Sequence, residues 1–123
     1  EIQRAAELIE KQINKKSKLY RYKFIFDDGK CGQGNSPATI AAKYINVDGI
    51  KFLITGCSGE TLQVGPMAQR SKVLLFAVMA NHSGVKMLGD YVFRTMYDKE
   101  KDMALFTNFL KKRLGEGGLA ILT

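Results

Sequence analysis

Two short apolar runs, joined by a glycine-rich turn and a helical segment, constrain the fold most strongly. Ile50 to Thr55 passes into Gly56-Cys57-Ser58-Gly59, and Glu60 to Arg70 then has the character of a helix with an acidic residue in its first turn. Val73 to Met79 follows as a second apolar run, typical of a strand that is buried on both faces of a parallel sheet. Because neighbouring parallel strands need a long crossover, this stretch predicts a strand-helix-strand unit.

The amino-terminal part of the chain continues the alternation of helices and strands. Apolar residues spaced by three or four positions predict an amphipathic helix from Ile2 through Ile13. From Tyr20 to Phe26 aromatic residues alternate with other side chains, which predicts a strand that ends at Asp27-Asp28-Gly29. We expect helices to cover this aromatic stripe, so that it belongs to the core.

Further elements are predicted on either side of the central unit. Ser36-Pro37 supplies an N-cap and a proline for a helix that continues to Asp48-Gly49, with Ala38, Ala41, Ala42 and Ile45 as its buried stripe. Towards the other end we expect a short strand at Tyr91 to Arg94, a helical stripe of Met103, Phe106, Leu110 and Leu114, and a strand at Leu119 to Leu122.

Strands that alternate with helices predict a three-layer α/β/α fold around a mostly parallel sheet. With 123 residues, 46% of them apolar, the chain is long enough for one core and one domain. Ligands of such sheets bind beyond the carboxyl ends of the strands. We therefore expect three loops to share one rim of the sheet, namely Asp27 to Gly34, Gly56 to Gly59 and Met79 to Gly84.

The net charge of +7 permits binding to nucleic acid or to anionic lipid, but its distribution does not favour either partner. The lysines are scattered, and the cluster Lys111-Lys112-Arg113 falls in the last turn of a predicted helix, where cations complement the helix dipole. No nucleic-acid-binding motif is present, so no nucleic-acid partner is expected. The apolar runs are also far shorter than the roughly 20 residues that cross a bilayer.

Ser58 is the strongest candidate for a ligand contact. It lies where a strand ends and a helix begins, so its hydroxyl and the free N–H groups of that helix could bind a carboxylate. The plain alternative is that Ser58 caps its own helix, and the two roles are compatible.

Signals for catalysis are weak. The segment Gly56-Cys57-Ser58-Gly59 lacks the G-x-S-x-G spacing of an acyl-transfer nucleophile, and Gly32-Gln33-Gly34 is too short for a dinucleotide fingerprint. His82 is the single histidine and, with two distant cysteines, makes a poor set of metal ligands. We expect no catalytic residue, metal or cofactor.

Cys31 and Cys57 both fall at the predicted rim, on adjacent strands. Their Cα atoms could therefore approach to the roughly 5.5 Å of a disulfide, which would imply an oxidising compartment. The alternative is two free thiols in a cytosolic domain, and the spacing alone leaves the two possibilities close to even.

Four motifs occur in order along almost the whole chain. They are Phe26-Asp27-Asp28 with Cys31 after it, Asn46-Val47-Asp48-Gly49-Ile50-Lys51, Gly56-Cys57-Ser58, and Asp90-Tyr91-Val92-Phe93-Arg94-Thr95 with Asp98. Their order and spacing resemble the amino-terminal lobe of the leucine/isoleucine/valine-binding proteins, the type I periplasmic solute-binding proteins of ABC transporters, whose lobes are flavodoxin-like.

The resemblance implies a disulfide between Cys31 and Cys57 and a ligand-binding role for Ser58. A second ligand loop of the family matches Met79, Ala80 and Asn81, although Asn81 stands where threonine is common. Residues 1–116 would then be the ligand-binding lobe without its first strand, and residues 117–123 the start of a hinge and second-lobe strand.

By this resemblance the expected function is that of an exported, periplasmic or extracytoplasmic binding protein for an ABC importer. It would hold an amino acid or similar small polar solute between two lobes and deliver it to a membrane permease, and it would not be an enzyme. Exchange of Leu119 to Leu122 between copies would give a swapped homodimer. Two alternatives remain at this stage, a ligand-sensing domain of a receptor or regulator, and a cytosolic flavodoxin-like α/β enzyme domain.

Overall fold

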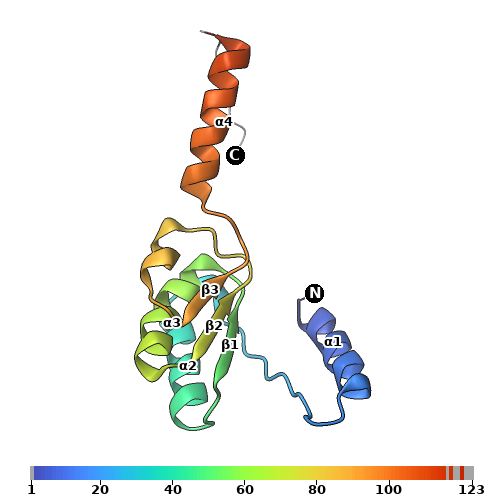
Figure 1. Cartoon of the computed structure of the whole chain (residues 1–123). Coiled ribbons are helices and arrows are strands. Elements are labelled where there is room, and N and C mark those ends of the chain that lie inside the picture. The colour runs from blue at the N-terminus through green and yellow to red at the C-terminus, as the bar shows by residue number, and fades with distance from the viewer. Residues whose placement is uncertain (1, 116, 118–119, 121–123) are drawn as a thin grey trace.

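The computed structural model describes residues 2–115, 117 and 120, and these form an α/β fold (Figure 1). In chain order the elements are α1 (Ile2–Lys16), the 3-10 helix η1 (Lys30–Gly32), α2 (Ser36–Asn46), β1 (Phe52–Thr55), α3 (Ser58–Ser71), β2 (Leu74–Ala77), the 3-10 helix η2 (Ser83–Met87), β3 (Val92–Arg94) and α4 (Lys99–Leu114).

The three strands form one parallel sheet in the order β1-β2-β3. Ile54 of β1 pairs with Phe76 of β2, and Phe76 pairs in turn with Phe93 of β3. The strand-helix-strand unit predicted from the sequence is thereby confirmed, with α3 as its crossover. Strand β3 and the helices predicted near both ends of the chain are confirmed as well.

Helices α2 and α3 cover one face of the sheet and form the core with it. Leu53 and Leu75 point from the strands into a cluster with Val64 and Ala68 of α3 and Ala41 of α2. The small alanine side chains let the helices lie close to the sheet, and Leu75 and Ala68 are fully buried. Of the alanine stripe expected on α2, only Ala41 is fully in the core, whereas Ala38 and Ala42 are half-buried.

The opposite face of the sheet is exposed among the described residues. Phe52 is 65% exposed and Phe76 is 41% exposed, whereas their chain neighbours Leu53 and Leu75 are buried. The prediction that Val73 to Met79 is buried on both faces is therefore wrong. Burial alternates along β2 because no described element packs over its second face.

The strand expected at Tyr20 to Phe26 is absent, and this prediction is corrected. The segment is extended, but its backbone bonds to side chains of α1 instead of to a neighbouring strand. The Asn14 side chain accepts from Tyr22 N at 2.8 Å and donates to Tyr22 O at 2.8 Å, and Glu10 accepts from Phe24 N at 2.6 Å. Tyr20 is 67% exposed, so the aromatic stripe is not part of the core.

Helices α1 and α4 project from the body of the molecule (Figure 1). The predicted stripe on α4 does not make a core, since Met103, Phe106 and Leu114 are exposed. Most of the strand expected at Leu119 to Leu122 lies outside the described residues. Within residues 2–115, no helix has the length and apolar character needed to span a membrane.

Candidate ligand-binding rim

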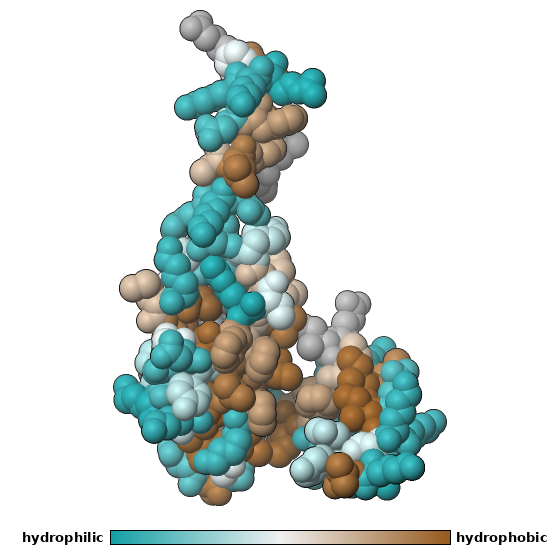
Figure 2. Space-filling model, in the orientation of Figure 1, coloured by the Kyte–Doolittle hydropathy of each residue, from teal (hydrophilic) through white to brown (hydrophobic). Residues whose placement is uncertain are grey.

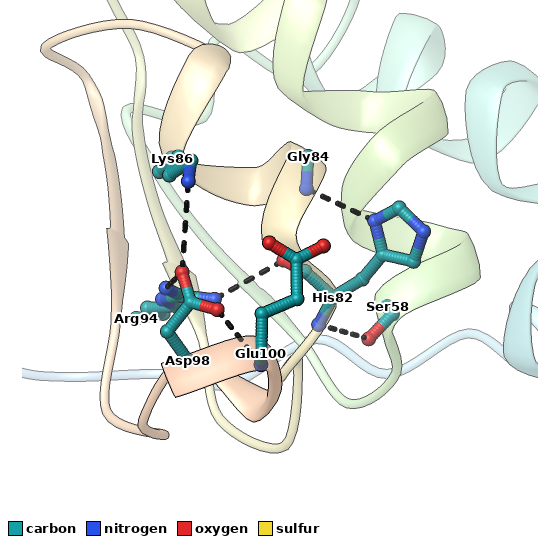
Figure 3. Close-up of polar contacts among 7 residues, drawn as sticks. All are labelled: Ser58, His82, Gly84, Lys86, Arg94, Asp98 and Glu100. Carbon is teal, nitrogen blue, oxygen red and sulfur yellow. Dashed lines mark hydrogen bonds and ion pairs between the residues drawn. The ribbon is translucent and has the colours of Figure 1, made fainter. Parts of the chain in front are cut away.

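The two loops that follow β1 and β2 run side by side beyond the carboxyl ends of their strands. Val78 N donates to Thr55 O at 2.9 Å, and Met79 N donates to Gly56 O at 3.1 Å, so the parallel ladder continues past both strands. The next contact along the pair uses a side chain, since His82 N donates to Ser58 Oγ at 3.3 Å (Figure 3). We call the loops 27–34, 56–59 and 79–84 together the rim.

Ser58 is the first residue of α3 and does not cap it. Cys57, with extended backbone, is the N-cap residue, and the Glu60 carboxylate accepts from Gly56 N at 2.9 Å and Cys57 N at 3.3 Å. The prediction of Ser58 as the N-cap is therefore wrong, because the helix begins one residue earlier and Ser58 is its first helical residue. Ser58 Oγ instead accepts from His82, and the hydroxyl keeps its own hydrogen to donate.

The other three expected ligand contacts lie on the neighbouring loop in different environments. Met79 is exposed, and Asn81 is half-buried with its carbonyl accepting from Lys99 N at 3.4 Å. Ala80 is fully buried in a small cluster with Ala77 and Val85. The Ala80 methyl group therefore anchors the loop in this buried cluster. Only the backbone atoms of this residue are suited to contact a ligand.

Cys31 and Cys57 form a disulfide, with their Cα atoms 5.2 Å apart. The bond is thus confirmed, and it ties the loop of residues 27–34 to the amino-terminal end of α3. The two backbones also lie very close together, because a Cβ built on Gly59 would lie 2.5 Å from Cys31 O. Gly32 O accepts from Gln63 Nε2 at 2.7 Å, which adds a third link between this loop and α3.

An ion cluster that was not predicted from the sequence, although Arg94 and Asp98 belong to one of the four motifs, fixes the far side of the rim (Figure 3). Arg94 Nη2 pairs with Asp98 Oδ2 at 3.0 Å, Arg94 Nη1 donates to His82 O at 3.1 Å, and Lys86 Nζ lies 3.9 Å from Asp98 Oδ2. Asp98 also caps α4 by accepting from Glu100 N at 3.1 Å. The signals available in the sequence were the Arg–Asp spacing of four residues and an aspartate just before a helix.

The side chain of Asp98 is only 8% exposed. Burial raises the pKa of this carboxyl, but the hydrogen bond from Arg94, the capping N–H of Glu100 and the charges of Lys86 and Arg94 outweigh it, so the net effect lowers the pKa of Asp98. Asp98 therefore carries its negative charge at neutral pH and holds Arg94 against the His82 carbonyl.

Two further features lie away from Ser58. Tyr44 Oη donates to Asp27 Oδ2 at 2.6 Å, and burial, followed by this bond and the charges of Asp27 and Asp48, raises the pKa of Tyr44 to about 12.

An open hollow of about 540 Å³ lies beside α1, lined by Glu10, Lys11, Asn14, Lys15 and Arg21. The described part of the chain contains no group of three His, Cys, Asp or Glu side chains suited to hold a metal ion.

Comparison of the chain with protein-family models, with curated proteins and with solved structures gives no significant match.

Proposed function

We propose that this chain is the amino-terminal lobe of the substrate-binding component of an ABC importer. In this proposal residues 1–116 belong to a flavodoxin-like lobe and residues 117–123 begin the connection to a second lobe. An amino acid or similar small polar solute binds between the lobes at the rim and is passed to a membrane permease.

The observation that carries the proposal is the position of Ser58. Its hydroxyl lies at the first turn of α3, beyond the carboxyl ends of parallel strands, where α/β folds bind ligands. Because the oxygen of the hydroxyl is already engaged by His82 N, its hydrogen is directed to another acceptor. The amino-terminal end of a helix also favours negative charge, so a carboxylate is the ligand group best suited to this place.

The adjacent loop supplies complementary groups. Asn81 offers both an amide donor and a carbonyl acceptor, which suits the ammonium and carboxylate groups of an amino acid. Its loop is held on one side by the carbonyl groups of Thr55 and Gly56 and the hydroxyl of Ser58, and on the other by Arg94, which bonds to His82 O. Ligand groups would therefore meet side chains that already have defined positions.

The disulfide supports an exported protein over a cytosolic enzyme domain. Disulfides form and persist in oxidising compartments and are rare in the cytosol. The cytosolic alternative required free thiols at Cys31 and Cys57, but the two cysteines are bonded to each other. On this ground we place the protein in the periplasm or another extracytoplasmic space.

The direct test is a titration of the isotopically labelled chain with single amino acids, followed by amide chemical shifts. One lobe provides half of the contacts, so we expect dissociation constants of about 1 mM, which this method detects. Shifts should concentrate at residues 58–60 and 79–82. Ser58→Ala should weaken binding at least about tenfold, because a hydrogen bond to a charged group contributes about 1.5–3 kcal/mol.

The matched control is Ser71→Ala, which alters a serine at the other end of the same helix. This variant should bind like the unaltered chain. Equal effects of the two substitutions, or shifts that avoid the rim with every amino acid tried, would contradict the proposal.

A further inference from the structure

Four apolar side chains form a continuous exposed surface, which we call the bare sheet face. Phe52 and Ile54 of β1, Phe76 of β2 and Phe93 of β3 point to the side of the sheet opposite α2 and α3, and their exposed fractions lie between 41% and 65%. The rings of Phe76 and Phe93 stack with centroids 5.6 Å apart. Figure 2 shows apolar surface on the body of the molecule and on the side of α1 that faces the body.

Helix α4 presents a second apolar surface without a partner among the described residues. Met103, Leu105, Phe106 and Phe109 are each half or more exposed, and the helix stands away from the body (Figure 1). Its first turn is nevertheless fixed, because Asp98 both caps the helix and pairs with Arg94 of β3. From this first turn the helix is directed away from the sheet (Figure 1).

The solvent-accessible area of the chain is larger than that of a compact monomer of the same mass. The chain exposes 9534 Å². A compact monomer of 13.7 kDa exposes roughly 6,600 Å² by the scaling of folded proteins with mass. The excess of about 2,900 Å² per chain also includes α1 and the segment after it, and it exceeds the roughly 800 Å² per partner that a stable interface of standard size buries.

We propose that the bare sheet face binds α4 of a second copy of this chain. The two surfaces lie apart on the same molecule in this structure (Figure 1), so a two-fold arrangement of two copies would place each sheet face against α4 of the partner. The 16 residues of α4 make a helix roughly 24 Å long, enough to cross three strands spaced about 5 Å apart. This interface goes beyond solute binding and uses surfaces away from the rim.

The charge of the chain predicts how this association responds to salt. Each copy carries +7, so two copies repel each other at low ionic strength while apolar contacts hold them together. Added salt should therefore strengthen the dimer. A partner recognised by charge, such as an anionic lipid surface, would bind more weakly as salt rises.

Sedimentation velocity on the 123-residue chain over a range of concentrations and salt tests the proposal. A species of twice 13.7 kDa is expected, favoured by salt. Phe52→Lys on the bare sheet face and Phe106→Glu on α4 should each raise the dissociation constant about 100-fold, because each dimer loses two buried phenylalanines. Val47→Lys is the matched control, since Val47 is 77% exposed at the end of α2 and should not alter the dimer.

Mixing the two interface variants identifies the contact. A mixed pair keeps one unaltered contact and places lysine against glutamate in the other, so dimers should reappear when the two monomeric variants are combined. Far-UV circular dichroism and disulfide mapping confirm that each variant is folded. A chain that stays monomeric at all concentrations overturns the proposal, and so does a dimer that Phe106→Glu leaves intact, which would indicate sheet-to-sheet packing instead.

Discussion

The close approach between the loop of residues 27–34 and α3 predicts a large difference between two glycines in that loop. A Cβ on Gly32, where φ is +90°, would overlap the Gly59 carbonyl carbon and lie 2.7 Å from Gly59 Cα and 2.8 Å from Glu60 N. A Cβ on Gly34, where φ is +67°, would meet nothing within 4 Å. Gly34→Ala therefore isolates the conformational cost, and Gly32→Ala adds a collision with backbone atoms that cannot rotate away.

The conformational cost of a left-handed backbone for alanine is about 1–2 kcal/mol. Overpacking adds typically about 1–3 kcal/mol more. Gly34→Ala should thus lower the free energy of unfolding by about 1–2 kcal/mol and Gly32→Ala by about 2–5 kcal/mol.

Urea denaturation with the disulfide intact measures both values on one scale. The same samples can be tested for amino-acid binding, because a displaced first turn of α3 would also displace Ser58. Equal losses of stability in the two variants would refute the argument, since they would show that the loop does not pack against the backbone of α3.

Three further predictions concern single links in the molecule. Replacing the disulfide by Cys31→Ala with Cys57→Ser should cost about 3.5 kcal/mol, the chain-entropy value for a 26-residue separation, and lower the urea midpoint by roughly 2 M; an unchanged midpoint would contradict this. Tyr44→Phe should cost about 1 kcal/mol through loss of the bond to Asp27. Because folding raises the pKa of Tyr44, the wild-type advantage should be complete below about pH 10 and disappear as the pH rises to about 12, in urea titrations at several pH values. Asp98→Asn should speed amide exchange in the first turn of α4 at neutral pH, and because the pKa of Asp98 is lowered, the difference from wild type should vanish only as the pH falls below the ordinary aspartate range.

The central unit of the fold could be predicted from the sequence because its signals are local. The apolar runs at β1 and β2, the turn at residues 56–59 and the helical pattern after it specify strand, crossover and strand without reference to the rest of the chain. Two of the three rim loops follow from the parallel topology, since the carboxyl ends of parallel strands meet at one edge, whereas the loop of residues 27–34 follows no strand and is tied to the rim by the disulfide. The pairing of the two cysteines did not follow from spacing alone, and only the family resemblance favoured it.

The strand prediction at Tyr20 to Phe26 failed because of competition for backbone hydrogen bonds. The alternating pattern of Tyr20 to Phe26 suits a strand, but a strand needs a neighbouring strand, and the side chains of α1 bond this backbone instead. Ser58 has a good side chain for capping, but α3 begins one residue earlier than a serine cap requires, with Cys57 as its N-cap, so the Ser58 hydroxyl bonds to the next loop instead. The Arg94–Asp98 pair depends on where β3 ends and α4 begins, which no single local pattern specifies.

The extension of the parallel ladder into the loop of residues 78–82 has a thermodynamic consequence for binding. Residues 78, 79 and 82 donate their N–H groups to the neighbouring loop, while Arg94 bonds to the carbonyl of residue 82. Ordering a free loop would cost roughly 1–2 kcal/mol per residue, and here folding has already met that cost. Differences in affinity among solutes should then arise from their functional groups and their desolvation, and the entropy of loop ordering should contribute little to selectivity.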